Sequence, residues 1–180
     1  MGKLPSLTLV IGGAASGKSD FAEHLVIKER ATRVYLATGQ AFDDEMADKI
    51  ARHKRARAGD GWQTVEEPTN LKGALSSLPA GAATLLDCAT MWLTNLIMDG
   101  ADIAVETGEL LAALSQVRGP VVIVSNETGH GIVPDNKLAR RFRQEQGQLN
   151  RQLAAQADLV VQVTVGLPRV LKGALPGDDI

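Results

Sequence analysis

Short apolar runs alternate along this chain with segments whose apolar residues recur at helical spacing. The runs predict β-strands at 7–11, 34–37, 63–65, 84–87, 121–125 and 159–164. The segments between and beside them predict helices at 18–30, 43–57, 70–78, 90–98, 107–116 and 136–157. Because strands that alternate with helices build parallel sheets, the pattern predicts an α/β fold with a mostly parallel central sheet flanked by helices.

The C-terminal part of the chain contains a clear helix pattern followed by a tail without one. The last predicted helix is strongly amphipathic, with Leu138, Phe142, Leu149 and Leu153 on one face. The tail after Gly166 carries proline and glycine, so we expect it to fray or to lie on the surface. With 180 residues, the whole chain (1–180) is expected to form a single domain.

Polar residues follow the predicted strands. They include Thr38-Gly39-Gln40, Glu66-Glu67, Asp87 and Asn126-Glu127. In open α/β sheets, ligands bind outside the carboxyl ends of the strands. Polar strand ends also occur in ordinary loops, but their convergence on one edge predicts a binding site there.

The first strand leads into a stretch that fits the pattern G-x-x-x-x-G-K-[ST] at every fixed position. Its residues are Gly12, Gly13, Ala14, Ala15, Ser16, Gly17, Lys18 and Ser19. Glycines let several backbone N–H groups point at one phosphate, and the following helix adds its positive N-terminal field. Lys18 is expected to reach the β- and γ-phosphates, and the Ser19 hydroxyl to hold Mg²⁺. The stretch therefore predicts binding of a nucleoside triphosphate.

Asp87 closes the fourth predicted strand and has two interpretations. It is placed like the carboxylate that binds Mg²⁺ in phosphate-loop enzymes, and it also suits the N-cap of the helix that follows. Glu127 could serve the metal from the neighbouring strand, and the sequence does not separate the two.

The segment 43–57 begins with acidic and ends with basic residues, which alone suits a helix dipole. His53 lies among the cations, where it is either an ordinary half-exposed side chain or a neutral imidazole able to attack phosphorus. A second basic cluster at 137–143 is expected to be a solvated helix face.

Composition narrows the function classes. A content of 44% hydrophobic and 22% charged residues is typical of a globular protein. The formal net charge of −2 and the 3% aromatic content argue against nucleic-acid binding. Cys88 is the single cysteine, which excludes an intrachain disulfide and argues against a metal site built from cysteines. No signal peptide or membrane-spanning run is visible, so the cytoplasm is the expected compartment.

Several motifs together resemble the bifunctional adenosylcobinamide kinase / adenosylcobinamide-phosphate guanylyltransferases of cobalamin biosynthesis. Besides the phosphate loop, they include Trp62 to Pro68, Leu86-Asp87-Cys88 and Trp92 to Leu96. The most specific are the predicted helix that runs from Asp43-Asp44-Glu45-Met46 to Arg52-His53-Lys54, and the segment Asn126 to Pro134. The resemblance implies a P-loop, RecA-like fold with a seven-stranded sheet and a homotrimer. It also implies two reactions. ATP or GTP phosphorylates adenosylcobinamide, and GMP from GTP is then transferred to adenosylcobinamide phosphate through a GMP bound to histidine.

By position, the resemblance assigns that histidine to His53, which is expected to be catalytic together with Lys18. It further implies nucleotide contacts from Ala37, Thr38, Gly39, Lys54, Arg55, Ala56, Arg57, Glu66 and Asp87. The carboxylates of Glu66 and Asp87 either accept from the guanine edge or, at Asp87 with Ser19, hold Mg²⁺. The chain departs from the family pattern at Ala15, where relatives often carry Arg, and at Thr128 and His130, where Val and Met are common.

Two other functions fit parts of the sequence. A plain small-molecule kinase would use the phosphate loop and leave His53 a structural role. A nucleotide-dependent switch would hydrolyse nucleotide in response to a protein partner and ignore corrinoids.

Overall fold

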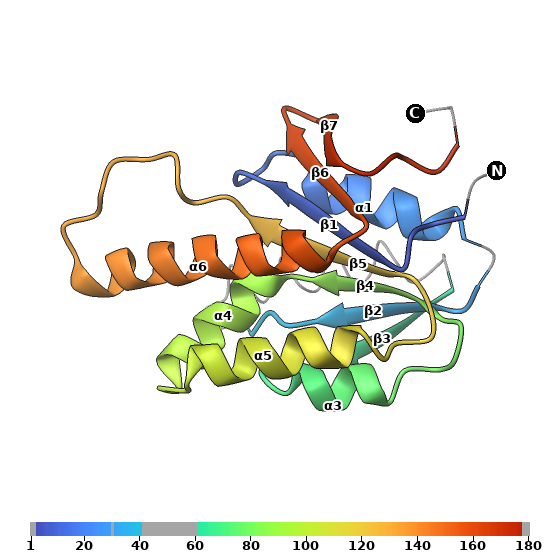
Figure 1. Ribbon diagram of the computed structural model, residues 1–180, viewed down its shortest axis with the longest axis horizontal. Coiled ribbons are helices and arrows are strands. Elements are labelled where there is room, and N and C mark those ends of the chain that lie inside the picture. The colour runs from blue at the N-terminus through green and yellow to red at the C-terminus, as the bar shows by residue number, and fades with distance from the viewer. Residues whose placement is uncertain (1–2, 30, 41–60, 178–180) are drawn as a thin grey trace.

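Seven strands form one sheet in the order β3-β2-β4-β5-β1-β6-β7 in the computed structural model, which describes residues 3–29, 31–40 and 61–177 (Figure 1). The six strands from β1 to β6 are parallel, and β7 runs antiparallel to β6. The strands are β1 (Leu7–Gly12), β2 (Arg33–Ala37), β3 (Trp62–Glu66), β4 (Ala83–Asp87), β5 (Val121–Asn126), β6 (Leu159–Thr164) and β7 (Leu167–Lys172). The helices are α1 (Lys18–Ile27), α3 (Leu71–Ser76), α4 (Ala89–Met98), α5 (Ile103–Leu114) and α6 (Lys137–Gln156).

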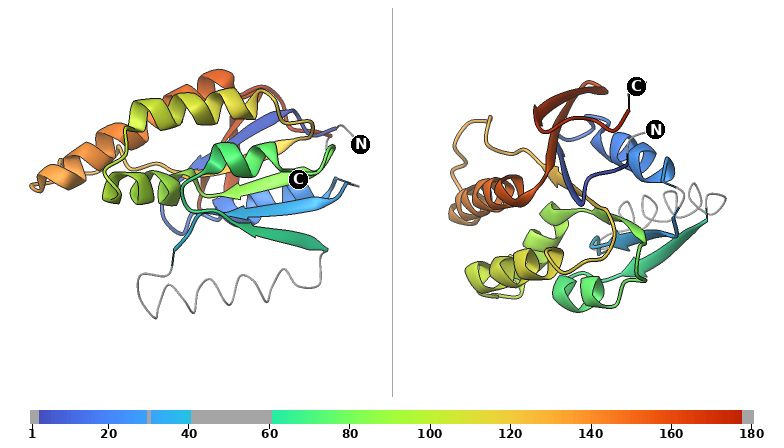
Figure 2. Two further views of the ribbon diagram at one scale, coloured as in Figure 1. Left: turned by 90° about the horizontal axis from the view of Figure 1, so that it is seen from below. Right: turned by 45° about the vertical axis from the view of Figure 1, so that its right-hand side comes forward.

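Both faces of the sheet are covered by helices, as the mostly apolar central strands require. Helix α1 packs on one face, and α3, α4, α5 and α6 pack on the other (Figure 2). Successive residues of β1 contribute to different faces of the sheet: Leu9 lies in the core under α3–α6, whereas Val10 lies in the core under α1. The predicted α/β fold with a mostly parallel sheet is confirmed.

The predicted elements agree with the structure to within a few residues, with one displaced helix. Helix α5 begins at Ile103, four residues before the predicted start, because the Asp102 side chain caps it by accepting hydrogen bonds from Ala104 N and Val105 N. Helix α1 ends at Ile27, ahead of the predicted residue 30. The predicted helix at 43–57 lies outside the described residues.

The tail after Gly166 lies on the surface, as one of the two expectations had it, but residues 167–172 do not fray and form a strand that the sequence analysis did not predict. Residues 167–172 form β7, joined to β6 by a tight turn in which Val165 and Gly166 have φ angles of 47° and 81°. Pro168 is tolerated because β7 is an edge strand, where a missing N–H costs no ladder bond. Most side chains of β7 are exposed, as they are in β3 at the opposite edge of the sheet.

Candidate active site

The phosphate loop connects β1 to α1 at the carboxyl edge of the sheet. Gly17 takes the N-cap position of α1 with a φ of 86°, a conformation that favours glycine. Gly12 has no room for a side chain, because a Cβ there would lie 2.6 Å from the carbonyl oxygen of Val163. Gly166 N donates to Ser16 O at 2.8 Å, which fastens the loop to the β6–β7 turn. The loop therefore packs closely against β6 at Gly12 and is bonded to the β6–β7 turn at Ser16.

Lys18 and Ser19 occupy the first turn of α1. The Lys18 side chain is 9% exposed, and its Nζ donates to Gly13 O at 3.1 Å, so the ammonium lies across the loop. Ser19 is half-buried beside it. The buried Ser16 Oγ has no hydrogen-bond partner among the described residues. Backbone N–H groups at a helix N-terminus and a nearby ammonium together favour an anion.

Asp87 ends β4 on the same edge. Its Oδ2 accepts a hydrogen bond from Tyr35 Oη at 2.8 Å, and α1 packs against β4 and β5. The interpretation of Asp87 as a helix N-cap is wrong, because Cys88 takes that position and no side chain caps α4. A carboxylate and a hydroxyl are both oxygen ligands of the kind that Mg²⁺ prefers, so the metal-binding interpretation of Asp87 with Ser19 stays a prediction.

Three of the predicted nucleotide contacts lie side by side. Ala37 of β2 pairs with Glu66 of β3 on one side and with Asp87 of β4 on the other. Glu66 is exposed, and Ala37 and Gly39 are half-buried. The strand ends therefore form a continuous row from Glu66 to Asp87, on the same edge of the sheet as the phosphate loop and separated from it by the end of β5.

Thr38 differs from its neighbours because its side chain is fully buried. Its Oγ1 donates to Cys88 O at 2.7 Å and accepts from Cys88 N at 2.9 Å. The side chain of Asn95, on α4, donates from Nδ2 to Thr38 O and to Pro68 O, at 2.9 Å each. The Thr38 hydroxyl thus joins β2 to β4, and Asn95 anchors the ends of β2 and β3 to α4. Sequence reasoning missed Asn95, although an asparagine within the apolar helix segment 89–98 was a signal.

A second buried polar cluster lies behind the end of β5, between α4 and α6. Ser125 Oγ donates to Asn150 Oδ1 at 2.6 Å, and Gln146 Nε2 donates to both Ser125 Oγ and Asn150 Oδ1 at 3.0 Å. Thr90 Oγ1 lies 3.5 Å from Ser125 Oγ. The sequence analysis did not predict this cluster.

Glu127 lies beyond the end of β5, and its N–H donates to Gly12 O at 2.9 Å. Its Oε1 accepts from Gly129 N at 2.6 Å, so the carboxylate stabilises the loop that follows. In that loop Thr128 is half-buried and His130 is exposed. Arg143, from the second basic cluster, donates to Gly129 O, so this cluster is not only a solvated face.

The remaining predicted site residues are His53, Lys54, Arg55, Ala56 and Arg57, which lie outside the described residues.

Burial raises the pKa of the Cys88 thiol to about 11, and the charge of Asp87 adds to the effect. The thiol is therefore protonated at neutral pH and is a poor nucleophile.

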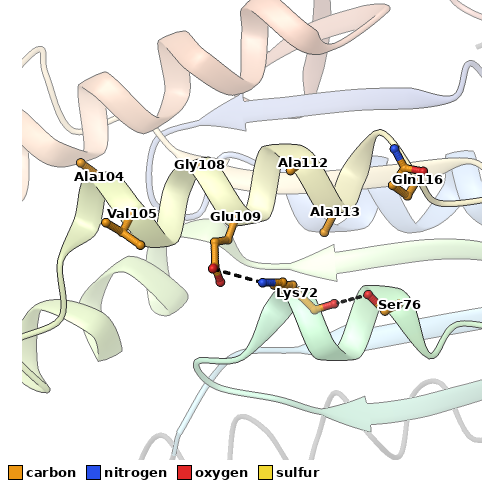
Figure 3. A pocket seen from close by; sticks show the side chains of 9 residues that line it. All are labelled: Lys72, Ser76, Ala104, Val105, Gly108, Glu109, Ala112, Ala113 and Gln116. Atoms are coloured by element: carbon orange, nitrogen blue, oxygen red, sulfur yellow. Dashed lines mark hydrogen bonds and ion pairs between the residues drawn. The ribbon is translucent and has the colours of Figure 1, made fainter.

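A groove of about 480 Å³ lies between α3 and α5, away from the phosphate loop (Figure 3). An ion pair between Lys72 and Glu109 crosses it at 3.1 Å. None of its lining residues is a predicted site residue.

Residues 8–171 match the family model described as "Cobinamide kinase / cobinamide phosphate guanyltransferase". The chain belongs to this family. It is 44% identical over 168 residues to the bifunctional adenosylcobalamin biosynthesis protein CobP of Pseudomonas aeruginosa, covering 92% of this chain and 96% of the relative. It is 40% identical over 177 residues to CobU of Escherichia coli, covering 89% and 97%. The resemblance seen in the sequence is confirmed, and the enzyme is a cobinamide kinase and cobinamide phosphate guanylyltransferase of cobalamin biosynthesis.

Solved structures support the fold. The RadB recombinase superposes with a TM-score of 0.52 at 12% identity, covering 99% of this enzyme and 86% of that chain. A protein from Pyrococcus horikoshii OT3 superposes with a TM-score of 0.56 at 9% identity, covering 98% and 93%. The predicted RecA-like P-loop fold of the enzyme is confirmed. In the described part of the chain, every helix is too short or too polar to span a bilayer.

Proposed function

We propose that the enzyme phosphorylates adenosylcobinamide with ATP or GTP and then transfers GMP from GTP to adenosylcobinamide phosphate, releasing pyrophosphate. One observation carries the proposal. The phosphate loop and Asp87 lie on one edge of the sheet, beside the row of strand ends from Glu66 to Asp87, in a chain of this family.

The phosphate loop is proposed to bind the triphosphate through its backbone N–H groups, with Lys18 at the β- and γ-phosphates. Ser19 and Asp87 would hold Mg²⁺, which neutralises phosphate charge when bound. Tyr35 supports this role of Asp87, because its hydroxyl occupies one carboxylate oxygen and fixes the orientation of the other. Ala37, Gly39 and Glu66 would contact the nucleoside.

His53 is proposed to be the nucleophile of the second reaction. An imidazole nitrogen bonds to the α-phosphorus of GTP while the bond from that phosphorus to the α–β bridging oxygen breaks, and pyrophosphate leaves with the electron pair. A phosphate oxygen of adenosylcobinamide phosphate then attacks the same phosphorus and the bond to nitrogen breaks. Lys54, Arg55 and Arg57 would stabilise charge on the α-phosphate.

One nucleotide site is proposed to serve both reactions through a shift of the segment 43–57. The reactions attack different phosphorus atoms, γ and α, and a single loop does not easily present both to one attacking group. Structures with and without GTP test this. If His53 contacts the α-phosphate in the GTP-bound structure and occupies the same position in the structure without GTP, the shift is refuted.

We also propose a homotrimer, as the family resemblance implies. Light scattering of the purified enzyme measures its mass, and a monomer at micromolar concentration would contradict the proposal.

The decisive experiment uses GTP labelled at the α-phosphate or at the γ-phosphate, incubated with the enzyme and Mg²⁺. After denaturation, label that stays on the protein is counted for the wild type, His53→Ala and the matched control His130→Ala. We expect acid-labile, alkali-stable α-label in the wild type and His130→Ala, and none in His53→Ala. Absence of α-label in the wild type, with γ-transfer to adenosylcobinamide intact, would leave a plain kinase.

A further inference from the structure

Asn126, the last residue of β5, occupies a central position at the carboxyl edge. Strand β5 lies between β1, which leads into the phosphate loop, and β4, which ends at Asp87. Asn126 pairs with Gly12, the first residue of the loop, and Val124 pairs with Asp87. Asn126 therefore stands level with the start of the loop and two residues beyond the level of Asp87.

The alternation of side chains places Asn126 on the face of the sheet that α1 covers. Val122 and Val124 of β5 belong to the core under α1, as does Leu85 of β4. Because successive side chains of a strand point to opposite faces, Asn126 and Asp87 continue these two rows on the same face. This face also carries α1, whose first turn holds Lys18.

The backbone of Asn126 is held from the opposite face. Its N–H donates to Thr90 Oγ1 at 2.8 Å, and its carbonyl oxygen accepts from Asn150 Nδ2 at 3.0 Å. Asn150 is fixed in turn by Ser125 and Gln146. Two helices, α4 and α6, thus fix the position of a single strand end.

The side chain of Asn126, in contrast, makes no hydrogen bond to any described residue, and the residue is half-buried. A half-buried carboxamide that is held so firmly by its backbone and has no partner of its own is placed to bind a ligand. Its neighbours are a loop suited to an anion and the carboxylate of Asp87.

We propose that the Asn126 side chain donates a hydrogen bond from Nδ2 to an oxygen of the terminal phosphate during the kinase reaction. The inference rests on the proposed binding of the triphosphate by the phosphate loop. In that reaction the cobinamide hydroxyl oxygen bonds to the γ-phosphorus, and the bond to the β–γ bridging oxygen breaks. The electron pair leaves on the nucleoside diphosphate, and the hydroxyl proton passes to water. A neutral, preplaced donor stabilises the charge on the transferred group without adding a charge that must be desolvated.

The γ-phosphate is the expected partner because of the order of the strands. Lys18 reaches the β- and γ-phosphates in this type of loop, and Asp87 would help to hold a metal ion that neutralises phosphate charge. Asn126 stands between these groups. The guanylyl transfer to His53 breaks a bond at the α-phosphate, so it depends less on Asn126.

The test separates the two reactions in Asn126→Ala, Asn126→Asp and the wild type. Gln162→Ala is the matched control, because Gln162 is half-buried on β6, the other neighbour of β1. Transfer of γ-label from ATP to adenosylcobinamide gives kcat and KM, and α-label from GTP on the protein reports the second reaction. Thermal melting shows whether each variant is folded.

We expect kcat for γ-transfer to fall about 100-fold in Asn126→Ala, with KM for ATP within a few-fold of the wild type, as for loss of one transition-state donor. Asn126→Asp, which replaces the donor by a negative charge, is expected to lose more. The amount of α-label on the Asn126→Ala protein should stay within about threefold of the wild type, because the lost contact is remote from the α-phosphorus. Both activities of Gln162→Ala should also stay within about threefold of the wild type.

An equal loss of α-label and γ-transfer in Asn126→Ala would show a merely structural role and overturn the inference, as would unchanged γ-transfer. If Asn126→Ala does not fold, the same comparison is made with Asn126→Ser, which keeps a donor and is expected to retain more γ-transfer than Asn126→Asp. Absence of α-label in the wild type would instead count against the proposed function, so the two failures are distinguishable.

Discussion

Asn95 supports the strand ends that are proposed to contact nucleotide, and replacing it tests how that support works. The side chain is 3% exposed, and its Nδ2 donates to Thr38 O and Pro68 O. In Asn95→Leu both carbonyl oxygens lose their donor while the volume of the side chain is roughly kept. Leaving a buried acceptor unpaired costs about 1–3 kcal/mol, and the cost is lower at the half-buried Pro68.

One term opposes this cost. Asn95 Oδ1 is buried and has no hydrogen-bond partner among the residues that the structure describes, so removing it relieves a penalty of about 1 kcal/mol. We therefore expect Asn95→Leu to lower the free energy of unfolding by about 2–3 kcal/mol. For a chain of this size that corresponds to a fall in Tm of roughly 5–10 °C. Nucleotide affinity should fall as well, because Thr38 directly follows β2, whose end belongs to the row of strand ends proposed to contact the nucleotide.

Urea unfolding of the variant and the wild type, followed by circular dichroism, measures the difference. Thr94→Val is the matched control in the same helix, because the Thr94 hydroxyl donates to the helix carbonyl of Thr90, within its own helix. It should change the stability by less than about 1 kcal/mol. A loss in Asn95→Leu below about 0.5 kcal/mol, with nucleotide affinity unchanged, would refute the reasoning, since both carbonyls would then be satisfied by water.

Asn95→Asp adds a pH dependence. Burial beside two carbonyl oxygens raises the pKa of the introduced carboxyl in the folded state. The folded state then favours the protonated form, so stability is highest below the unfolded pKa of about 4 and falls as the pH rises toward the folded pKa. We expect Asn95→Asp to be less destabilised at pH 5 than at pH 8, and equal destabilisation at both would contradict this.

Three further predictions test other parts of the structure. Gly12→Ala should cost about 1–3 kcal/mol in urea unfolding, because its Cβ would meet a backbone carbonyl of β6, whereas Gly13→Ala, with nothing within 4 Å, should be nearly neutral. Since the pKa of Cys88 is raised to about 11 from 9.0, the unfolded thiol ionises first as the pH rises, and the wild type should lose roughly 1 kcal/mol relative to Cys88→Ala between pH 8 and 10. A flat difference over that range would contradict it. Lys72→Met should change stability by less than about 0.5 kcal/mol, because the Lys72–Glu109 ion pair is largely exposed; a loss above 1 kcal/mol would show that the groove depends on it.

Features of the fold that repeat locally could be predicted from the sequence. The apolar strands and the amphipathic α6 carry their periodicity in neighbouring residues, and the phosphate loop carries its chemistry in eight consecutive positions. Strand β7 was missed because Pro168, its second residue, is a residue type that argues against a strand in sequence.

The arrangement of the site depends on strand register and on hydrogen bonds between residues far apart in the sequence, which no local sequence pattern encodes. The positions of Glu66, Ala37 and Asp87 in one row follow from the register of three strands. Asp87 proved not to be a helix cap because the chain takes one more residue before α4 begins, which neither propensity nor spacing could decide. Buried polar residues such as Asn95 are visible in the sequence, but their partners lie more than twenty residues away.

The two buried polar arrangements give the carboxyl edge a common property. One fixes the end of β2 through Asn95, and the other fixes the end of β5 through Asn150. Both act through backbone carbonyls rather than through the side chains that face the site, so they set positions without consuming donors or acceptors needed for substrate. An edge fixed in this way cannot easily move between a reaction at the γ-phosphate and one at the α-phosphate. The change between the two reactions must then come from the substrates or from His53, which is the physical reason for proposing a shift of the segment 43–57.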